Sequence, residues 1–580
     1  MSLLKRLYER ARRVSALRTL GRLPVMSAVK RRVMGRLLPH ITGYNAWVAD
    51  HVRARRGAYP ATAEPGLLSF LTPVWNTPVP YLRVLAESLL AQARTQPFEW
   101  VLLDNGSANE DTRDYLRRLA RHPAVRFFRV EPNRGIVGGM RFCLEHAAGR
   151  YVLPLDSDDR LYGDSVAILA WHIRRAGHPA ILYTDEDHLT DGRALLPYFK
   201  PDWDPVLCLN SAYIAHLGAL DRRRALDLNV YGDADAEGCH DWDTFFKFVA
   251  AGHTPVHVPE IVYSWRMHQG STAMNMTSKS FIHDSHAAVL RRFLDRLPQA
   301  RRYHVEPSPL FAGTPDWWIR RRHTDARPLL SLVLGGSESS ALQRVLRRGD
   351  YPDHQACGIP RDAGPQSLRE PVRRQAARGG LVCLVSERVN IENPEWPWEV
   401  LALGEIHGDV AVVGGPLYGP DGRALEAGRH FGFGDGCGCP LRGVRRQDVG
   451  WNALHHKQRS VSAVSSQFCV FEAAFLAEFL DVCPPEATLP FLGAWAGAYA
   501  LRTAKRVVYS PFLAGRTEED WEALVRPNER KHFLAANRDI IPDTRYYPRL
   551  LDLRADHAFE PSSDAARQEH LRTLYQDPAN

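Results

Sequence analysis

Leu153-Pro154-Leu155-Asp156-Ser157-Asp158-Asp159 places three carboxylates at the end of an apolar segment. Residues 151–155 are predicted to form a short buried strand, and the acidic residues fall where that strand leaves its sheet. Carboxylates packed this closely repel one another unless a cation lies among them. Mg²⁺ and Mn²⁺ prefer oxygen ligands, often one or two carboxylates together with phosphate oxygens of a substrate. The stretch indicates either a cation site or a solvated acidic turn, and the flanking sequence favours the cation site.

The segments before this stretch alternate between strand and helix patterns. The predicted strands are 67–73, 99–103 and 125–130, and the predicted helices are 81–93, 112–121 and 135–148. Strands alternating with helices of this length indicate a parallel α/β sheet covered on both faces. In open sheets of this kind, ligands bind beyond the carboxyl ends of the strands. Thr72, Asp104 and the acidic stretch all lie at such ends.

The composition is that of an ordinary globular chain, with 45% hydrophobic and 24% charged residues among 580. This length exceeds a single core, so two or three domains are expected. No segment reaches the roughly 18 apolar residues of a membrane span, and no signal-peptide pattern opens the sequence. The nine cysteines are scattered, without a disulfide or zinc-site pattern. We therefore expect a cytoplasmic protein.

Much of the net charge of +8 lies near the N-terminus, where Glu9 is the only acid before residue 40. Leu3, Leu4, Leu7 and Val14 recur at helical spacing there, which predicts a basic amphipathic helix. Such a helix either lies on the anionic inner face of the cytoplasmic membrane or packs on the protein body. Nucleic-acid binding is disfavoured, because no aromatic side chains alternate with the basic ones.

Motifs follow the predicted strands in a characteristic order. They are Thr72-Pro73-Val74-Trp75-Asn76, Leu103-Asp104-Asn105-Gly106-Ser107, Asn133-Arg134-Gly135, Leu155-Asp156-Ser157-Asp158-Asp159, Tyr183-Thr184-Asp185-Glu186-Asp187, Pro197-Tyr198-Phe199-Lys200-Pro201-Asp202-Trp203, His240-Asp241-Trp242-Asp243 and Tyr263-Ser264-Trp265-Arg266-Met267-His268. No single motif is specific, but the ordered set resembles glycosyltransferase family 2. It is most similar to bacterial enzymes that build cell-surface polysaccharide, such as O-antigen.

The resemblance implies a GT-A nucleotide-diphospho-sugar transferase fold, which is a Rossmann-like, mostly parallel α/β sheet joined to an acceptor half. It also implies a nucleotide-sugar donor site formed by Thr72, Pro73, Asp104, Arg134, Asp156, Ser157 and Asp158. In this interpretation Asp104 contacts the nucleobase, Asp156 the ribose or base side, and Asp158 a Mn²⁺ or Mg²⁺ ion on the donor diphosphate. His268 completes the metal shell, unless it is an ordinary surface or core histidine.

Asp241 is implied as the general base that deprotonates the acceptor hydroxyl. Its alternative interpretation is an N-cap of the predicted helix 244–251. The family usually has an acidic residue or glutamine before this aspartate, whereas this chain has His240.

An acceptor groove is also implied. Its residues are Asp185, Tyr198, Lys200, Trp203 and His240. A packed aromatic turn would explain Tyr198 and Trp203 equally well.

The region from about 327 to 530 is predicted to be a second copy. Leu329-Leu330-Ser331-Leu332-Val333 echoes Leu67-Leu68-Ser69-Phe70-Leu71, and Asp191-Gly192-Arg193-Ala194-Leu195 recurs at 421–425. Aligning those turns places Ser386 over Asp156 and Arg388 over Asp158, and a guanidinium cannot coordinate a cation. Aligning Pro259 with Pro511 places Gly493 over Asp241. The copy is therefore expected to be degenerate, with packing, acceptor binding or partner docking as its role, unless it is an unrelated α/β domain.

The sequence predicts four segments: a basic helical segment over 1–62, a catalytic GT-A domain over 63–325, a degenerate GT-A-like domain over 326–530 and a tail over 531–580. The expected activity is inverting, metal-dependent transfer of a hexosyl or deoxyhexosyl group to a cell-surface polysaccharide or lipid-linked glycan. One rival is a synthase that adds more than one sugar type, which would need two active copies. The other is a non-catalytic glycan-binding or scaffold subunit of a polysaccharide assembly complex.

Overall fold

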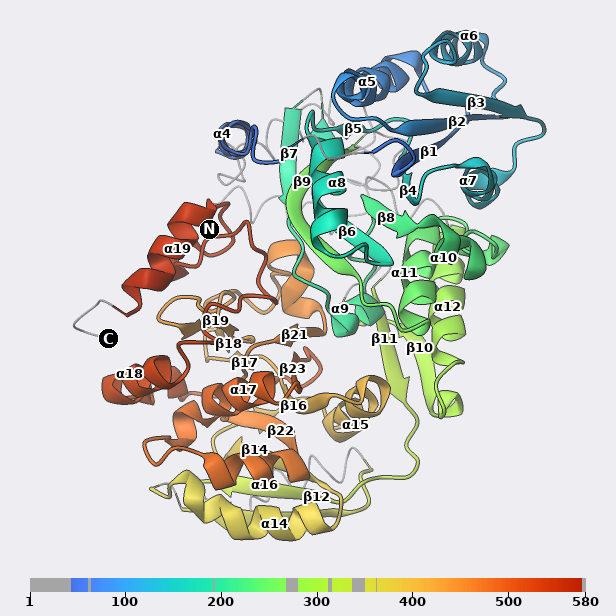
Figure 1. Ribbon diagram of the computed structural model, residues 1–580. Helices are drawn as coiled ribbons and strands as arrows, with labels where there is room; N and C mark the ends of the chain where they lie inside the picture. The colour runs from blue at the N-terminus through green and yellow to red at the C-terminus, as the bar shows by residue number, and fades with distance from the viewer. Residues whose placement is uncertain are drawn as a thin grey trace, which may run out of the picture.

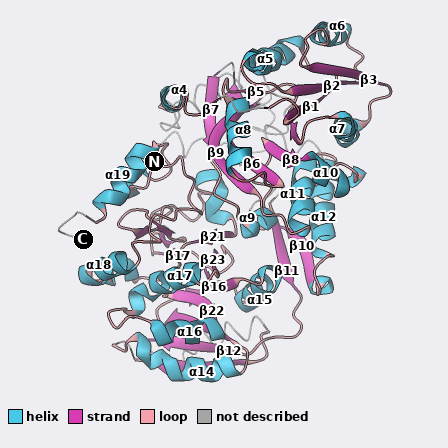
Figure 2. Ribbon diagram, viewed as in Figure 1, coloured by secondary structure: helices cyan, strands magenta, loops and turns pink. Residues whose placement is uncertain are grey.

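The computed structural model describes residues 43–60, 64–190, 193–267, 280–310, 316–335, 350–360 and 362–575. These residues form two α/β units arranged end to end, with the first at the top and the second at the bottom of Figure 1. Strands lie at the centre of each unit and helices lie outside them (Figure 2). The predicted N-terminal helix and His268 fall outside the described residues.

The first unit is built on one nine-stranded sheet with the order β3-β2-β1-β4-β8-β6-β9-β5, and β7 pairs with β6. Strands β1 to β4 are parallel to their neighbours in this group, whereas β8 runs antiparallel to β4 and β6. The strands are β1 (Leu68–Val74), β2 (Glu99–Asn105), β3 (Val125–Val130), β4 (Tyr151–Pro154), β5 (Arg160–Leu161), β6 (Ile181–Thr190), β7 (Arg193–Tyr198), β8 (Gly218–Asp221) and β9 (Val256–Arg266). The predicted α/β fold class, a mostly parallel GT-A-type sheet followed by a second α/β unit, is confirmed.

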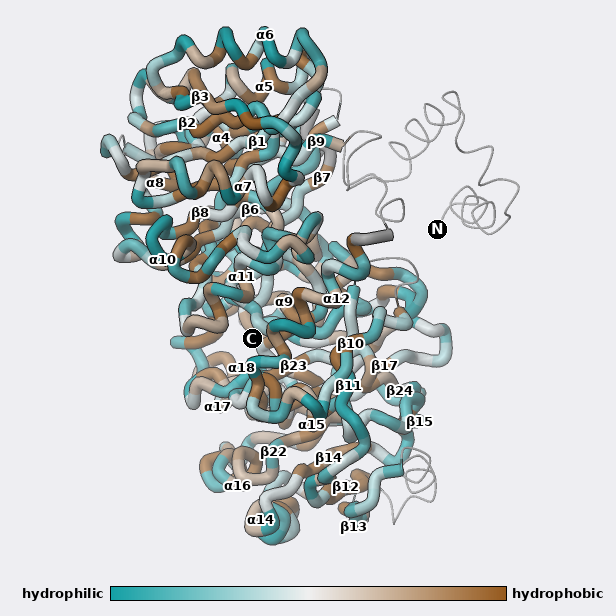
Figure 3. The backbone as a smooth tube through the Cα atoms, turned by 90° about the vertical axis from the view of Figure 1, so that its right-hand side faces the viewer, coloured by the Kyte–Doolittle hydropathy of each residue, from teal (hydrophilic) through white to brown (hydrophobic). Residues whose placement is uncertain are grey.

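Helices cover both faces of this sheet, and β1 and β2 are therefore mostly apolar and buried. The helices are α4 (Tyr44–Ala54), α5 (Val79–Leu90), α6 (Glu110–Leu119), α7 (Gly135–His146), α8 (Ser165–Arg175), α9 (Pro205–Asn210), α10 (Arg222–Asp227), α11 (His240–Ala250) and α12 (Ser280–Leu294). Trp100 and Leu102 of β2 pack in one core with α5 and α6, and Val101 and Leu103 pack in the other with α7. The alternation follows from the period of two in a strand. Figure 3 shows hydrophobic runs along β1 and β2 and a mixed pattern along α6.

The second unit repeats this topology with most of its strands divided between two sheets, and β19 and β20 form a separate two-stranded sheet. The orders of the two larger sheets are β13-β12-β14-β22-β16-β23-β21 and β15-β24-β17-β18. The strands are β12 (Leu329–Leu334), β13 (His354–Ile359), β14 (Leu381–Ser386), β15 (Asn390–Ile391), β16 (Val410–Gly414), β17 (Leu417–Tyr418), β18 (Ala424–Glu426), β19 (His430–Phe431), β20 (Cys437–Gly438), β21 (Arg459–Val461), β22 (Phe468–Glu472), β23 (Arg506–Tyr509) and β24 (Gly515–Arg516).

Strand directions in the two units correspond one by one. Strand β22 is antiparallel to both β14 and β16, as β8 is to β4 and β6. Strand β23 is parallel to β16, as β9 is to β6. The hairpin β17–β18 matches β6–β7, and β15 pairs with β24 as β5 pairs with β9. Among the described residues, β3 has no counterpart in the second unit.

The helices of the second unit and of the C-terminal tail complete the description. They are α14 (Arg369–Ala377), α15 (Trp396–His407), α16 (Ala473–Val482), α17 (Leu492–Arg502), α18 (Pro527–Ala536) and α19 (Asp564–Thr573), and the hairpin β10 (Tyr303–Pro307) and β11 (Trp317–Arg321) joins the units. None of the described helices combines the length and the hydropathy that crossing a membrane requires.

Polar contacts fasten the two units together around α9. The Asp204 carboxylate accepts hydrogen bonds from the backbone N–H and the hydroxyl of Ser460, both at 2.7 Å. The Asn210 side chain accepts one from Gln458 N–H at 3.1 Å. Asp204, Asn210 and Ser460 are buried. Since a buried polar group without a partner is costly, these contacts hold the units in one arrangement.

Helix α4 is fastened to the first unit by a buried arginine. The Arg55 guanidinium bonds Asp164 at 2.8 Å and Glu260 at 2.7 Å, and His51 and Tyr59 also reach the Glu260 carboxylate. Burial alone would raise the pKa of Glu260, but His51, Arg55 and Tyr59 outweigh burial and lower it from 4.5 to about 2.

A depressed carboxyl pKa makes stability depend on pH in the acid range. The contribution of Glu260 is fully present above pH 4.5, the unfolded value, and is lost as the pH falls toward 2. The shift corresponds to about 3 kcal/mol in the free energy of unfolding. In urea titrations between pH 5 and 2, Glu260→Gln should lose this part of the pH dependence, and Glu478→Gln, on the exposed side of α16, should retain it. An unchanged pH profile in Glu260→Gln would contradict the assignment.

Two helical glycines of the second unit allow a matched test of packing. A Cβ at Gly493 of α17 would lie 1.9 Å from the Val464 carbonyl oxygen, whereas one at Gly404 of α15 would meet nothing within 4 Å. Gly493→Ala should therefore lower the free energy of unfolding by about 1–3 kcal/mol through overpacking. Gly404→Ala should raise it by about 0.5–1 kcal/mol, because alanine favours the helix. Equal effects in chemical denaturation would show that α17 does not pack this closely.

Candidate active site at the carboxyl edge of the first sheet

The acidic stretch forms the loop between β4 and β5, and its last aspartate anchors it. Asp159 is fully buried, and its carboxylate accepts hydrogen bonds from the Arg266 backbone N–H at 2.7 Å and from the Tyr263 hydroxyl. Burial, and then the neighbouring Asp158 and Asp156, raise the pKa of Asp159 well above its ordinary value. The anchor leaves Asp156 and Asp158 partly exposed at the edge of the sheet.

The side chain of Arg266 holds the same loop from a second direction. Its Nε donates to the backbone oxygen of Asp158 at 2.5 Å, and its guanidinium lies 4.6 Å from the centre of the Tyr81 ring. Its Nη2 is buried and has no hydrogen-bond partner among the described residues. A buried cationic N–H group beside carboxylates therefore remains available to an anion.

His216 bridges the loop to a buried carboxylate on β6. Its Nε2 lies 3.5 Å from Asp156 Oδ2, and its Nδ1 lies 3.4 Å from Glu186 Oε2. Burial disfavours the imidazolium, but Glu186 and Asp156 outweigh burial and raise the pKa of His216 well above its ordinary value. Burial likewise works against the charged form of Asp156, yet His216 and His240 lower the pKa of this carboxyl group.

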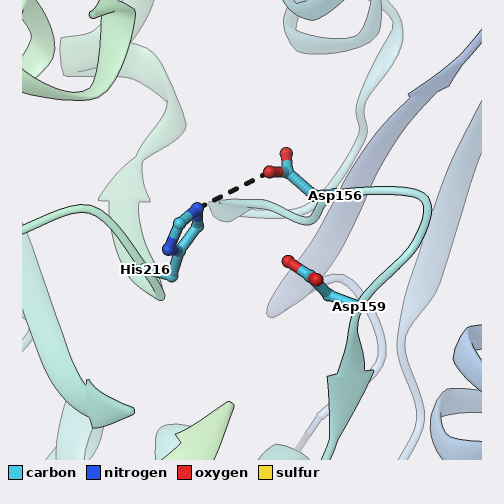
Figure 4. Close-up of side chains that lie close together, drawn as sticks. All are labelled: Asp156, Asp159 and His216. Atoms are coloured by element: carbon cyan, nitrogen blue, oxygen red, sulfur yellow. Dashed lines mark ion pairs between the residues drawn. The ribbon is translucent and has the colours of Figure 1, made fainter. Parts of the chain in front are cut away.

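Asp156, Asp159 and His216 form a group whose potential ligand atoms lie within 4.8 Å of one another. Figure 4 shows these side chains converging from the acidic loop and from the segment before β8. The carboxylate oxygens suit a divalent cation such as Mn²⁺ or Mg²⁺, and His216 could join them as a ligand only after its imidazolium lost a proton. The mutual repulsion of Asp156, Asp158 and Asp159 would be relieved by such an ion, so the residues present fit a divalent cation.

A charged network below the surface supports His216. Lys200 Nζ lies 3.3 Å from Glu186 Oε2 and donates to the backbone oxygens of Thr184 at 2.7 Å and His216 at 2.6 Å. Burial raises the pKa of Glu186, but Lys200 and His216 dominate and lower it to about 2. The Asp185 carboxylate accepts from Lys200 N–H at 2.8 Å and pairs with His257 at 3.0 Å.

Lys200 and Asp185 are thus buried, and their contacts with the described residues lie inside the protein. The predicted acceptor residues Tyr198 and Trp203 are partly exposed near them. Tyr198 and Lys200 line a cavity of about 20 Å³ against the second unit. Contact of these four residues with an acceptor stays a prediction, and the geometry gives Lys200 and Asp185 a supporting position behind the acidic loop.

The predicted donor residues lie at the ends of β1, β2 and β4. The buried Thr72 hydroxyl accepts from the Trp100 indole at 2.9 Å, and the Asp104 carboxylate accepts from Ser107 N–H at 2.9 Å and pairs with Arg129. Ser157 lies 2.6 Å from the Thr77 hydroxyl, which ties the acidic loop to the loop after β1.

Three more side chains surround the end of β1. Pro73 is partly exposed and Arg134 is exposed at the start of α7. Trp75, which the sequence did not single out, is 59% exposed directly after β1. An indole in this position is available to stack on a ligand.

Asp241 and His240 begin α11 on the opposite side of the acidic loop. The predicted helix started at Thr244, whereas α11 begins at His240, so Asp241 lies in the first turn instead of preceding it. Its Oδ1 accepts from Trp242 N–H at 2.8 Å. Burial raises the pKa of Tyr231, and the charges of Asp241 and Asp156 add to this effect. Both carboxylates therefore face one buried tyrosine, and the fold brings them to the same region.

The segment before α11 is fastened to the donor side by a glutamate that the sequence did not indicate. The Glu237 carboxylate accepts from the N–H groups of Ile136 at 2.7 Å and Val137 at 3.0 Å, at the N-terminus of α7. A carboxylate there complements the helix dipole and satisfies two free donors. Among the residues missed, Glu186 and Arg266 stood inside quoted motifs, but Glu237 and His216 carried no sequence signal.

Comparison with known proteins identifies relatives of this chain. Residues 69–216 match the family model described as Glycosyl transferase family 2. Uncharacterized protein y4gI of Sinorhizobium fredii (strain NBRC 101917 / NGR234) is 27% identical over 405 residues, covering 63% of this chain and 44% of the relative. O-antigen biosynthesis protein RfbC of Myxococcus xanthus is 24% identical over 444 residues, covering 70% of this chain and 34% of the relative.

Chondroitin synthase of Escherichia coli is 27% identical over 244 residues, which is 42% of this chain and 34% of that protein. The alignments thus span less than half the length of each of these curated relatives.

Proposed function

We propose that this chain is an inverting, metal-dependent transferase that moves a sugar from a nucleotide donor to a growing cell-surface glycan, and the match of residues 69–216 to the glycosyltransferase family 2 model supports this. The observation that carries the proposal is the acidic loop at the carboxyl edge of a parallel sheet, with Asp156 and Asp158 partly exposed, and with Asp156 and Asp241 both acting on the pKa of Tyr231. Open α/β sheets bind their ligands at this edge.

The donor would lie over the ends of β1, β2 and β4. The exposed Trp75 offers a face for the nucleobase, and Asp104 and Asp156 offer carboxylate acceptors for base and ribose. Nη2 of Arg266, which has no hydrogen-bond partner among the described residues, would offer a charge-assisted hydrogen bond to the departing diphosphate. Exposed Arg134 at the N-terminus of α7 adds positive charge near the same position.

Asp158 and His268 are the predicted ligands of the divalent cation, with Asp156 and His216 beside them. When bound, the cation supplies positive charge that stabilises the nucleoside diphosphate as a leaving group. The chain's own contribution is to hold the carboxylates at the sheet edge through Asp159, Tyr263 and the backbone of Arg266.

Asp241 would remove the proton of the acceptor hydroxyl. In a single displacement, the acceptor oxygen forms a bond to the anomeric carbon as the bond from that carbon to the phosphate oxygen breaks, and the hydroxyl proton passes to the Asp241 carboxylate. One base on the acceptor side suits inversion. The contact between Glu237 and α7 keeps the segment before Asp241 close to the donor side.

Metal dependence is tested at Asp158. In a screen of nucleotide sugars for donor hydrolysis and transfer with Mn²⁺ or Mg²⁺, excess chelator should abolish turnover. Asp158→Asn should weaken donor binding about tenfold or more in metal-containing buffer, because one charged ligand is lost. Asp111→Asn, on the exposed side of α6, is the matched control and should behave like the unsubstituted protein. Full activity in excess chelator would contradict the proposed metal dependence.

The role of Asp241 is tested by a change that keeps its shape. Asp241→Asn should lower kcat by roughly 10² or more while donor binding persists, because only the proton acceptor is removed. Asp243→Asn, two residues on, loses ion pairs with Lys247 and Arg292 and should lower stability without a comparable loss of kcat. A folded Asp241→Asn variant with normal kcat would show that another group accepts the proton of the acceptor hydroxyl. Residual transfer by Asp158→Ala combined with Asp241→Asn would locate catalysis elsewhere in the chain.

A further inference from the structure

The donor position of the second unit is filled by apolar side chains. Among the described residues, a cavity of about 70 Å³ lies at the ends of β12 and β14. Leu334, Leu489, Trp521 and Leu524 line it together with Ser386, Glu387 and Glu519. Sites for small ligands usually measure about 300–1,000 Å³. Arg388, aligned with Asp158, pairs with Glu519 at 3.2 Å. Within the described part of the chain, this cavity is too small for a nucleotide sugar.

The position aligned with the proposed base is closed as well. Helices α11 and α17 occupy the same place in the two topologies, and Gly493 of α17 stands where α11 has Asp241. A Cβ at Gly493 would meet the Val464 carbonyl oxygen at 1.9 Å. Backbone thus occupies the space that a catalytic side chain and an acceptor hydroxyl would need.

A large cavity of about 970 Å³ is nevertheless present elsewhere in the second unit. We call it the hairpin cleft, because one wall is the glycine-rich hairpin β19–β20 with Gly434 and Gly438. Arg429, Arg442 and Glu522 form a second wall, and Thr573 and Leu574 at the end of α19 form a third. Its volume lies at the upper end of the range for ligand sites.

The hairpin cleft is built by the chain segment that replaces the predicted acceptor segment of the first unit. In the first unit, residues 199–217 join β7 to β8 and contain Lys200 and Trp203. In the second unit, residues 427–467 join β18 to β22, the matching strands, and supply Arg429, the hairpin and Arg442. Compared with the first unit, the second unit has a smaller space at the position of the donor site and a longer segment at the position of the predicted acceptor segment.

The charges of the hairpin cleft disfavour a polyanionic ligand, because each arginine that lines the cleft is already paired with a carboxylate of the protein. Arg429 pairs with Glu426 at 2.7 Å and with Glu522, and Arg442 pairs with Asp520. Arg554, also in the lining, pairs with Asp552 at 2.7 Å.

A phosphate or uronate would face these carboxylates as well as the guanidinium groups. Sugar hydroxyl groups suit both the guanidinium groups and the carboxylates of the cleft, since a hydroxyl accepts hydrogen bonds from guanidinium N–H groups and donates them to carboxylates. Leu425, Pro440 and Leu574 add apolar surface for the carbon faces of sugar rings.

We propose that the hairpin cleft binds a neutral, hydroxyl-rich oligosaccharide, as a secondary site for the glycan that the first unit extends. The identity of that glycan as acceptor rests on the proposed function, whereas the binding itself does not. The second unit then acts as a saccharide-binding module derived from a transferase fold.

The test measures binding to the full chain without any donor, so that turnover plays no part. The probes are an array of neutral oligosaccharides, an array of uronic-acid oligosaccharides, and UDP-sugars with Mn²⁺, followed by calorimetry on the best neutral binder. The first unit is expected to bind a nucleotide sugar, so Asp158→Asn is measured in parallel to subtract any binding of the UDP-sugar probes at that site. Neutral oligosaccharides should bind, and the uronic-acid series should not.

The matched variants lie next to each other on α19. Thr573 is exposed and lines the cleft, so Thr573→Trp should fill it and weaken binding of the neutral oligosaccharide at least tenfold. Arg572 is exposed and does not line the cleft, so Arg572→Trp should leave binding unchanged. In transfer assays, Thr573→Trp should raise KM for long acceptors and leave kcat on a monosaccharide acceptor unchanged.

Three results would overturn the proposal: no neutral oligosaccharide binds, uronic-acid probes bind as well or better, or the two tryptophan variants lose binding equally. The outcome is separable from that of the proposed function. Binding that is sensitive to Thr573→Trp in a chain without transferase activity would refute the enzyme and keep the cleft. Sugar transfer by a chain that does not bind neutral oligosaccharides in the hairpin cleft would support the enzyme and refute the cleft proposal.

Discussion

The burial of Asp159 is the interaction on which the site of the first unit depends. A carboxylate without access to water must be hydrogen-bonded, and here the Tyr263 hydroxyl and the Arg266 backbone N–H satisfy it. Both partners lie at the end of β9, so the acidic loop can only sit where β9 ends. Asp156 and Asp158, on either side of Ser157, are thereby held at the surface.

The network behind the loop follows the same physical rule. Glu186 is buried and charged, which is tolerable because Lys200 and His216 compensate it. His216 in turn reaches Asp156, so positive charge on the buried side opposes negative charge at the rim. The arrangement holds carboxylates at the rim, where the proposed cation would bind, while keeping the interior electrically balanced.

The two units show how one topology can retain its core and change its edges. Strand order and direction are common to both, because the buried faces of the strands depend on packing between helices and sheet. The loops at the carboxyl edge carry no such constraint. In the second unit, Trp521 and Leu524 line the small cavity at the position of the donor site, and the segment between β18 and β22 is longer than its counterpart in the first unit. Fold and site are therefore separable properties.

The sequence by itself determined the fold class, the positions of β1 to β4 and the placement of Thr72, Asp104 and Asp156 at one sheet edge, because strand and helix periods are local properties of the chain. It also indicated the repeat, since residues 329–333 resemble 67–71 and residues 421–425 repeat 191–195. Only the tertiary structure decided that Lys200 and Asp185 are buried, that Asp241 lies inside a helical turn, and that His216 and Glu237 belong to the site. Those facts depend on contacts between residues far apart in the chain, such as Glu237 with Ile136. A local sequence pattern does not determine such contacts, because they form only when the folded chain brings the two segments together.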